Sequence, residues 1–389
     1  MCIIIKRYFL TVLNIFLCIY VVFFAGLHAA IYAGFLREYF RDRKSRLRTE
    51  DKVSIIIPIH NESSRIDGLL RTLLIQSYPA QIVFIDDRST DDSQQKLALF
   101  AEEAIKKNID CRIITLEENP GANKKQFALS MGIKEADGDY LLFTDGDCEI
   151  QPDWVRTMVS RMDEKTGVVI GSVFKKKQDR GFLFLYQCYD HVVRFNYLIG
   201  TIGLGAAGGG FGNNMMVSRL ALESIGGYEA VPPSPTEDAA LISHIRSMNK
   251  FKIHSAVHPN AAVETETEKS WPSFFNQTLR WNNGGLFSPE LLTRINYNFL
   301  MLIIGAGILV IPLVPFFPQL WPMPVTVYFF MVVHTIAALA VFRKNMPKGK
   351  LITALGYLLC LLYMPCHLTI LTIMGYLKVK TTWKSHKMT

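Results

Sequence analysis

The stretch KVSIIIPIHNESSRIDGLLRTLLIQSYPAQIVFIDDRSTDD, residues 52–92, decides the fold class. It contains two short runs rich in β-branched residues, Val53–Ile59 and Gln81–Ile85, with a helical segment at Ser64–Gln76 between them. Short β-branched runs bounded by turn residues are typical of strands. Strand, helix and strand in succession indicate two parallel strands joined by a crossover helix.

The same alternation continues toward the middle of the chain. Further segments follow in the order helix, strand, helix and strand: Gln94–Asn108, Cys111–Leu116, Lys124–Glu135 and Tyr140–Thr144. The pattern predicts an α/β domain with a doubly wound, mostly parallel sheet. Ligands bind such sheets outside the carboxyl ends of the strands, so functional residues are expected there.

Outside this region the chain is strongly apolar. Half of its 389 residues are hydrophobic and its mean hydropathy is +0.19, yet 20% of its residues are charged. Residues 50–290 have the composition of an ordinary globular protein, whereas 8–36 and 296–377 carry long apolar runs. A mixed protein, part globular and part membrane-embedded, is indicated.

Residues 8–36 are longer than the roughly 20 residues that a helix needs to cross a bilayer, and we predict an amino-terminal transmembrane helix there. A cleavable signal peptide is the competing interpretation. It is disfavoured because seven basic residues follow the apolar run and only two precede it. The seven are Arg37, Arg41, Arg43, Lys44, Arg46, Arg48 and Lys52.

The formal net charge of +8 is explained by basic residues that flank membrane segments, because much of the excess lies beside the apolar runs. Two further basic groups follow later apolar runs: Arg343, Lys344, Lys348 and Lys350, then Lys378, Lys380, Lys384 and Lys387. The positive-inside rule places such residues in the cytosol, which predicts an outside amino terminus and a cytosolic domain from Arg37 onward. Nucleic acid is not an expected partner.

The apolar region 296–377 contains two clear spans, 296–318 and 323–342, joined by a short turn. The third segment, 351–377, has Pro365 near its middle and leaves two alternatives open. A single span would place the four terminal lysines outside. A broken, re-entrant hairpin would keep them inside.

Acidic groups follow two strands of the predicted sheet. The first strand ends in Pro58-Ile-His-Asn61-Glu62, and the second in Ile85-Asp86-Asp87-Arg-Ser89-Thr-Asp91-Asp92. Ser89 or Thr90 could cap the next helix, which is the structural interpretation of the second group. Capping accounts for one polar residue and not for four crowded carboxylates, so a functional role is favoured.

The triplet Asp145-Gly146-Asp147 directly follows the strand Tyr140–Thr144. Two carboxylates separated by one small residue can approach a single hard cation. Mg²⁺ typically takes one or two carboxylates together with substrate phosphates. We therefore predict that Asp145 and Asp147 bind a divalent cation, Mg²⁺ or Mn²⁺.

Five motifs in order give the chain a recognisable pattern: Pro-x-His-Asn-Glu, Asp-Asp-x-Ser-x-Asp, Asp-x-Asp, Thr236-Glu237-Asp238 and Gln277-Thr-Leu-Arg280-Trp281. In this order the chain resembles family 2 glycosyltransferases. It resembles in particular the membrane-bound subset with cellulose, hyaluronan and poly-N-acetylglucosamine synthases and ceramide glucosyltransferases. The resemblance implies a GT-A catalytic domain at 50–268, an interfacial helix at 269–290 and a carboxyl-terminal membrane region at 296–377.

The resemblance also implies a role for each motif residue. The donor site, for a UDP-sugar, would include Pro58, Asn61, Glu62, Asp86, Asp87, Lys124, Lys125 and Asp145. The catalytic group would include Asp238 as general base, with Glu237, Gln277, Arg280 and Trp281. Direct displacement by an acceptor hydroxyl needs a carboxylate base and positive charge at the departing diphosphate, and it inverts the anomeric centre.

Structural interpretations remain for the two later motifs. Thr236 could cap a helix at Ala239–Met248, and Gln277-x-x-Arg280-Trp281 could form an amphipathic helix at the membrane surface. However, Gln277, Arg280 and Trp281 fall on one helical face, which membrane binding alone does not require. The run from Gly203 to Gly208 formally matches a dinucleotide fingerprint and continues into Gly209, Gly210 and Gly212. A loop in close approach to sugar or acceptor fits this glycine density better.

The acceptor is a choice between a lipid or lipid-like alcohol and a growing polysaccharide. The few membrane helices favour a lipid acceptor, because the polymer synthases that the chain resembles generally carry more amino-terminal helices. A non-catalytic donor-binding subunit of a synthase complex is a third alternative, disfavoured because every acidic motif is present. We expect an integral protein of a bacterial inner membrane, with no obligate protein partner inferable.

Overall fold

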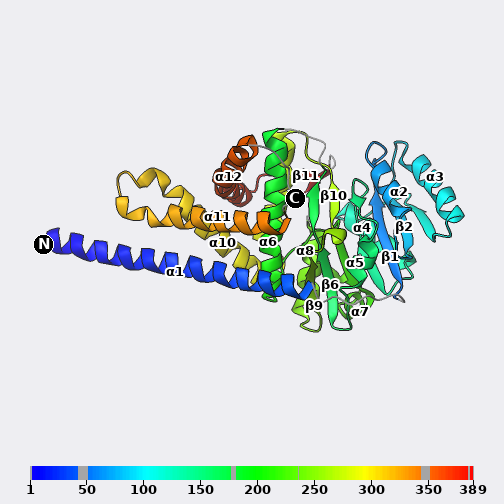
Figure 1. The fold of residues 1–389 in the computed structure, drawn as a ribbon, viewed down its shortest axis with the longest axis horizontal. Coiled ribbons are helices and arrows are strands. Elements are labelled where there is room, and N and C mark those ends of the chain that lie inside the picture. The colour runs from blue at the N-terminus through cyan, green and yellow to red at the C-terminus, as the bar shows by residue number, and fades with distance from the viewer. Residues whose placement is uncertain are drawn as a thin grey trace.

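The computed structural model describes residues 2–42, 51–176, 181–234, 236–342, 351–383 and 386–388. Part of the predicted cytosolic charge lies outside these residues: Arg43, Lys44, Arg46, Arg48, Arg343, Lys344, Lys348, Lys350 and Lys384. The molecule has two parts, an α/β domain at one end and long apolar helices that project from it (Figure 1).

The α/β domain is built on a seven-stranded sheet with strand order β3-β2-β1-β4-β8-β6-β9. Its strands are β1 (Val53–Ile59), β2 (Gln81–Asp86), β3 (Cys111–Thr115), β4 (Tyr140–Phe143), β6 (Thr166–Gly171), β8 (Met215–Ser218) and β9 (Lys252–Ala256). The first four are mutually parallel, and β8 runs antiparallel to both of its neighbours. The predicted mostly parallel sheet is confirmed.

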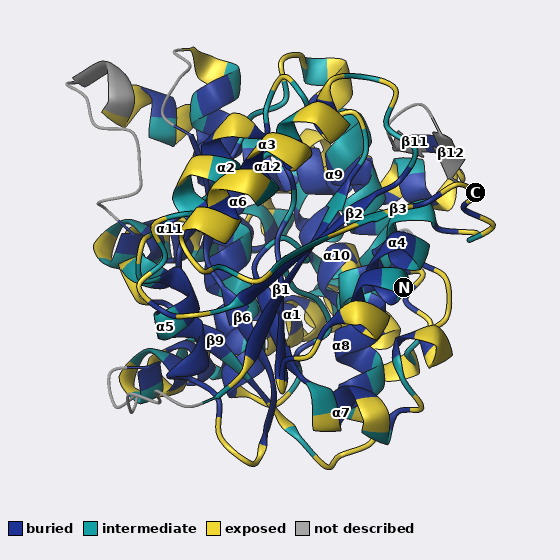
Figure 2. Cartoon of the chain, turned by 90° about the vertical axis from the view of Figure 1, so that its right-hand side faces the viewer, coloured by how far each residue is buried: buried dark blue, intermediate teal, exposed yellow. Residues whose placement is uncertain are grey.

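Helices cover both faces of the sheet because β1 and β2 are apolar on both sides. Ile55 and Ile57 pack with α2 (Asp67–Leu73) and α3 (Ser93–Lys106), while Ile56, pointing the other way, packs with α4 (Lys124–Glu135). Near-continuous apolar runs of this kind are typical of strands that are buried on both faces. Figure 2 shows buried strands in the centre, with exposed surface on the outer sides of α2 and α3.

Smaller elements complete the domain. A second sheet has the order β5 (Glu149–Ile150), β10 (Val263–Thr265) and β7 (Val173–Lys175). The short helices are α5 (Trp154–Val159), α7 (Arg219–Ser224), η1 (Tyr228–Ala230), α8 (Glu237–Ser247) and η2 (Pro259–Ala261).

In the part of the chain that the structure describes, four helices are long and apolar enough to cross a membrane. They are α1 (Cys2–Asp42), α10 (Leu291–Leu309), α11 (Pro322–Phe342) and α12 (Leu351–Tyr376). Three of them, α1, α10 and α11, run along the long axis of the molecule (Figure 1). Two short turns, η3 (Ile311–Leu313) and η4 (Pro318–Leu320), join α10 to α11 at the end far from the sheet.

The segment with Pro365 has the single helix that the first of the two predicted alternatives requires. It is one continuous helix, α12, and not a hairpin. It is also seen nearly end-on in Figure 1, so it lies across the direction of α1, α10 and α11. Beside it runs α9 (Trp271–Leu286): His367 of α12 contacts Thr278, and Gly375 lies against Asn283. The chain therefore ends, through β11 (Thr381–Trp383) and β12 (His386–Met388), near the α/β domain.

The α/β domain and the apolar helices are joined through α6 (Phe182–Gly203), which crosses α1. The crossing leaves no space for side chains: a Cβ on Gly34 would lie 2.1 Å from the carbonyl oxygen of Gly200, and one on Gly203 2.0 Å from that of Gly34. Small residues permit such close approach of two helices.

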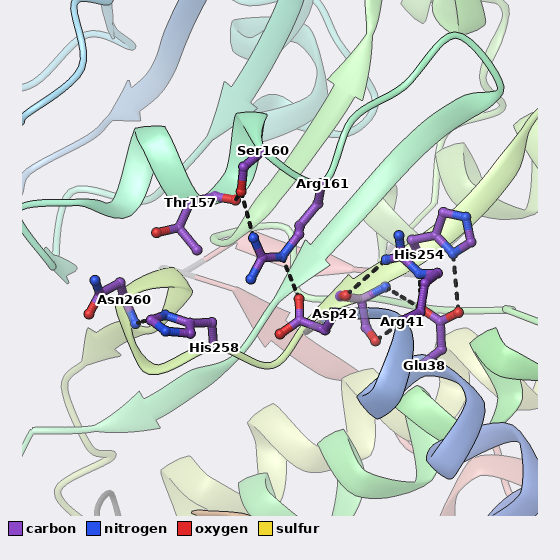
Figure 3. A network of polar contacts seen from close by, with 10 residues as sticks. Glu38, Arg41, Asp42, Thr157, Ser160, Arg161, His254, His258 and Asn260 are labelled. Atoms are coloured by element: carbon purple, nitrogen blue, oxygen red, sulfur yellow. Dashed lines mark hydrogen bonds and ion pairs between the residues drawn. The ribbon is translucent and has the colours of Figure 1, made fainter. Parts of the chain in front are cut away.

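Polar contacts fix the end of α1 to the domain (Figure 3). Glu38 accepts hydrogen bonds from the Ser255 backbone N–H and contacts Nδ1 of His254 at 3.1 Å. Asp42 and Arg161, both less than 10% exposed, form an ion pair. The first helix is thus attached by a buried polar network and not only by its apolar surface.

Removing one partner of the Asp42–Arg161 pair is expected to destabilise the protein. Arg161→Met leaves the Asp42 carboxylate buried without its counter-charge, which costs about 3–5 kcal/mol of unfolding free energy. Thermal unfolding in detergent micelles measures the loss. The double variant Asp42→Asn, Arg161→Met should recover most of it, and equal Tm values for the single variant and the wild type would contradict the assignment.

Candidate active site

A cavity of about 900 Å³ opens at the carboxyl ends of β1 and β4 and continues between α6, α9 and the long apolar helices. Most of the predicted functional residues line it: Pro58, Glu62, Asp87, Lys125, Asp145, Asp147, Glu237, Asp238, Gln277, Arg280 and Trp281. Residues that are more than 200 positions apart in sequence therefore meet at the edge of the sheet where ligands of doubly wound folds bind.

Three predicted donor residues, Asn61, Asp86 and Lys124, do not line the cavity. Asn61 has a left-handed backbone, with φ at 53°, and its side-chain oxygen accepts a hydrogen bond from Thr90 N–H. Asp86 is fully buried and accepts from Gln94. Lys124 turns away to donate to the backbone carbonyl of Asn119, and the side-chain amide of Asn119 donates to Asp87. These side chains organise the loops that carry Glu62, Asp87 and Lys125.

The competing capping interpretation of the second acidic group does not hold. Helix α3 begins at Ser93, and neither Ser89 nor Thr90 caps it. Asp91 instead accepts hydrogen bonds from the N–H groups of Ser63 and Ser93 and ties the first loop to the second. His60 contacts the carbonyl oxygen of Asp87 and also lines the cavity.

Asp145 and Asp147 follow β4 and present partly exposed carboxylates to the cavity. Asp145 pairs with Lys125 at 2.8 Å, and Asp147 accepts a hydrogen bond from Thr265 at 3.0 Å. Gly146 lies between them without space for a side chain, because a Cβ there would lie 2.9 Å from Ile59. The backbone between the two carboxylates is therefore tightly packed against β1.

Within the described ranges, no group of three or more His, Cys, Asp or Glu side chains is arranged to hold a metal ion. The donor set at this position is thus two carboxylates in a cavity large enough for a ligand. Such a set fits a Mg²⁺-type cation that completes its coordination with phosphate oxygens and water, and it does not fit a structural metal centre.

Lys125 connects the Asp145-Gly146-Asp147 motif to the helix that carries Asp238. Its ammonium lies 2.8 Å from Asp145 and 3.1 Å from Glu237. Burial alone lowers the pKa of Lys125, but these two carboxylates outweigh burial and raise the pKa above its ordinary value. The lysine is therefore a permanent positive charge at the centre of the site.

Asp238 lies in the first turn of α8, which begins at Glu237, two residues earlier than predicted. One carboxylate oxygen accepts from the N–H of Gly212 at 2.8 Å and the other from its own neighbour Ala239 at 2.8 Å. Burial and the adjacent charge of Glu237 raise the pKa of Asp238 to about 6, against the opposing effect of Lys125. A carboxylate with this pKa is suited to accept a proton near neutral pH.

The glycine-rich run forms part of the cavity wall, as the predicted close-approach loop requires. Gly208 to Gly212 line the cavity, and a Cβ on Gly210 would lie 2.5 Å from Ile242. Gly212 lies directly against Asp238. Bare backbone at this place lets an N–H group reach the carboxylate.

On α9, Gln277, Arg280 and Trp281 all face the cavity, which confirms that they share one face. Gln277 donates to Glu268 at 3.0 Å, and the Trp281 ring meets His191 edge-on at a centroid distance of 5.3 Å. The small residues after Trp281 permit close packing: Gly284 lies against Thr236 and Gly285 against the ring of Tyr297.

Several cavity residues were not predicted from the sequence: Arg65, Lys175, His191, Arg194 and Glu268. Burial lowers the pKa of Lys175, although Asp147 and Glu268 oppose this shift. Arg194 is paired with Asp190 at 2.8 Å inside α6. Asp190 and Arg194 are spaced four residues apart in an apolar helix, and this spacing could have identified them as candidate site residues.

The cavity has a second, apolar section on the side of the long helices. It is lined there by side chains of α1, α10 and α11, among them Leu27, Phe299, Leu300, Ile304 and Met331. One continuous cavity therefore joins the carboxylates at the sheet edge to the helices that are long and apolar enough to cross a membrane.

Comparison with known proteins identifies the domain. Residues 54–226 match the family described as glycosyl transferase family 2. Poly-beta-1,6-N-acetyl-D-glucosamine synthase of Staphylococcus aureus (strain COL) is 29% identical over 296 residues, which cover 72% of this chain and 66% of that protein. The probable glycosyltransferase YdaM of Bacillus subtilis (strain 168) is 24% identical over 258 residues, covering 63% and 57%. The chain spans less than two thirds of the length of these relatives.

Among solved structures, the mannosyltransferase PcManGT of Pyrobaculum calidifontis, in complex with GDP-Man and Mn²⁺, superposes on 93% of this chain and 99% of its own. The TM-score is 0.53 and the sequence identity 19%, so the likeness shows the fold. Together with the sheet order and the motifs in the cavity, these matches show that the chain has a GT-A fold and that its residues 54–226 are a glycosyl transferase family 2 domain.

Proposed function

We propose that the protein is an inverting glycosyltransferase that moves a hexosyl group, of the glucose or N-acetylglucosamine class, from a UDP-sugar to a membrane-associated lipid or lipid-like alcohol. The continuous cavity carries this proposal. Its polar section holds the carboxylates and Arg280, and its apolar section lies among α1, α10 and α11. A lipid alcohol could place its hydroxyl at Asp238 while its chain stays among apolar side chains.

The chain's residues supply the elements of a single displacement. Asp238, fixed by two backbone N–H groups, takes the proton of the attacking hydroxyl. Arg280 and Lys125 bring positive charge to the region of the departing diphosphate. A divalent cation held by Asp145 and Asp147 would supply further positive charge for that group. Attack from the face opposite the leaving group inverts the anomeric centre.

A processive polysaccharide synthase is the second candidate. It is favoured by the relatives, because poly-beta-1,6-N-acetyl-D-glucosamine synthases are 29% identical over 72% of the chain. Both candidates use the same donor site, so the product distinguishes them. A non-catalytic subunit is disfavoured by the geometry, since Asp145, Asp147 and Asp238 all line one cavity.

The decisive experiment supplies a panel of UDP-sugars to membranes that contain the protein and analyses the products by mass spectrometry. A sugar attached to an organic-solvent-extractable lipid, absent from membranes with Asp238→Asn, supports the first candidate. A polymer that remains after extraction establishes the second. Absence of any sugar-containing product, with every donor intact, would refute a glycosyltransferase activity for this chain.

The activity is expected to fall at acidic pH with an apparent pKa near 6. Below this pH the Asp238 carboxyl group is protonated and cannot accept the hydroxyl proton, so kcat/KM should drop roughly tenfold per pH unit. Above it the carboxylate is ionised and the profile should level. The measurement is initial rate against pH at saturating metal. A flat profile between about pH 5 and 7 would show that Asp238 is not the titrating base.

We further propose that the α/β domain lies in the cytosol at a bacterial inner membrane, and that α12 lies along the membrane surface. Arg37 and Arg41 of α1 and the lysines that follow α12 would then share the cytosolic side. A green fluorescent protein fused after Thr389 should fluoresce, and alkaline phosphatase fused there should be inactive. A fusion at Phe317, between α10 and α11, is the matched control and should give the reverse. Active phosphatase after Thr389 would contradict this orientation.

A further inference from the structure

Two histidines line the apolar section of the cavity, His28 of α1 and His334 of α11. Each is at most 5% exposed. His28 precedes Arg37 by nine residues, which places it about 14 Å farther along the helix, away from the α/β domain. Ionisable side chains inside a membrane region are costly and usually functional. The active-site chemistry at Asp238 uses neither of them.

The ring of His28 is held in a fixed orientation and protonation pattern. It packs against both Phe24 and Phe330, each at a centroid distance of 4.3 Å. Its Nδ1 lies 2.8 Å from the carbonyl oxygen of Phe24, which can only accept, so the ring proton is on Nδ1. The other nitrogen, Nε2, is therefore a hydrogen-bond acceptor.

His334 has the opposite arrangement. The amide nitrogen of Asn196 lies 3.4 Å from its Nδ1 and donates to it, so the ring proton of His334 is on Nε2. The two imidazole rings are 5.2 Å apart and edge-on. Side by side in the cavity wall they present one acceptor, Nε2 of His28, and one donor, Nε2–H of His334.

Neighbouring polar atoms also lack partners. Tyr32 Oη and Asn196 Oδ1 are among the buried side-chain atoms, in the described part of the chain, that have no hydrogen-bond partner. The Tyr32 ring lies 5.0 Å from His334, and Asn196 is the residue that binds His334. Neither Tyr32 nor Asn196 lines the cavity, so a ligand there would reach the two histidines and not these atoms.

We propose that His28 and His334 form a subsite for a hydroxyl group of the acceptor, inside the membrane section of the cavity. A hydroxyl both donates and accepts, so it can give its proton to Nε2 of His28 and receive the proton of His334. The inference rests on the proposed function, since it concerns the acceptor of that reaction. The hydroxyl belongs either to a lipid or to a growing glycan, and the test separates the two sources.

Ligand binding is measured with protein in lipid nanodiscs and corrected for empty nanodiscs. The lipid probes are tritiated 1-decanol and its methyl ether, and the glycan probes are chitotetraose and its permethylated form. The ether oxygen can accept but has no proton to donate. Wild-type protein should prefer the hydroxyl form of one pair by about tenfold, the size of one well-made hydrogen bond. The pair that shows the preference identifies the source.

Replacing each histidine by phenylalanine should change probe binding in a different way. His28→Phe should abolish the preference for the hydroxyl form, because it removes the acceptor. His334→Phe should weaken hydroxyl and ether forms alike by about tenfold while keeping their ratio. His28→Gln, which retains an acceptor, should restore the preference. A purely structural role would not produce this division.

Ile336→Leu, an apolar change on the exposed side of α11 and outside the cavity, is the matched control and should leave the preference unaltered. Equal binding of hydroxyl and ether forms by the wild type, in both probe pairs, would overturn the proposal. So would a preference that persists in His28→Phe. No sugar transfer is needed for this measurement. Loss of the proposed function would be seen separately, as a failure of the same preparations to turn over any UDP-sugar.

Discussion

Asp238→Asn is expected to reduce sugar transfer by at least about 10³-fold, while the donor still binds. General base catalysis typically contributes a factor of about 10² to 10⁴ to a rate. Among the carboxylates described above for the site, Asp238 is the one held by the N–H groups of Gly212 and Ala239. It lies at the start of α8, held by Gly212 N–H, with a pKa raised to about 6. An asparagine side chain has the same size but cannot take a proton at this pH.

Two measurements separate loss of the base from loss of the site. Binding of UDP to the variant, by calorimetry, should stay within about threefold of wild type, because Asp145 and Lys125 are unchanged. The thermal unfolding temperature should also change little. Glu237→Gln is the informative neighbour: it removes a partner of Lys125, so donor binding should weaken while part of the turnover remains. Wild-type turnover in Asp238→Asn would refute the base assignment.

Replacing Asp145 or Asp147 by asparagine is expected to raise the metal concentration for half-maximal activity by more than about tenfold and to lower kcat by about 10²-fold. Each substitution removes one of two carboxylates available to a divalent cation, which then depends on the remaining one and on phosphate oxygens. The measurement is initial rate against Mg²⁺ and Mn²⁺ concentration, with UDP release monitored in parallel.

Asp153→Asn provides a charge-matched control for this prediction. Asp153 precedes α5, and its carboxylate accepts hydrogen bonds from Ser77 and Asn260 outside the cavity. Its removal should leave the metal response unchanged. Full activity in excess chelator, or an identical metal response in all variants, would contradict a cation at Asp145 and Asp147.

Local pattern was sufficient to predict the polar section of the site. Each of Glu62, Asp87 and Asp145 follows a strand, and parallel strands end at one edge, so their approach needs no knowledge of long-range packing. The face of α9 was predictable for the same reason, since Gln277, Arg280 and Trp281 are related by helical periodicity. The site residues could thus be predicted from the sequence where secondary structure alone positions their side chains.

The remaining features depend on tertiary contacts that leave no local signal. Lys124 and Lys125 are adjacent in sequence, and only packing decides that Lys125 enters the cavity while Lys124 binds Asn119. The orientation of α12 is another example. Its composition permits a membrane span, yet contacts of His367 and Gly375 with α9 determine how it lies. A role for His28 could not be predicted either, because it depends on the contact with His334, some 300 residues later in the sequence.

The glycine crossing of α1 and α6 bears on how this protein can be produced for study. A truncated form that starts at residue 51 would lose Gly34 and the wall residues Leu27, His28 and Ile31, and would expose the apolar side of α6 to solvent. A generic leader helix grafted in place of α1 would collide with α6, because any side chain at position 34 overlaps the backbone of Gly200. The first helix is therefore not an interchangeable anchor, and crystallisation or screening should retain it intact.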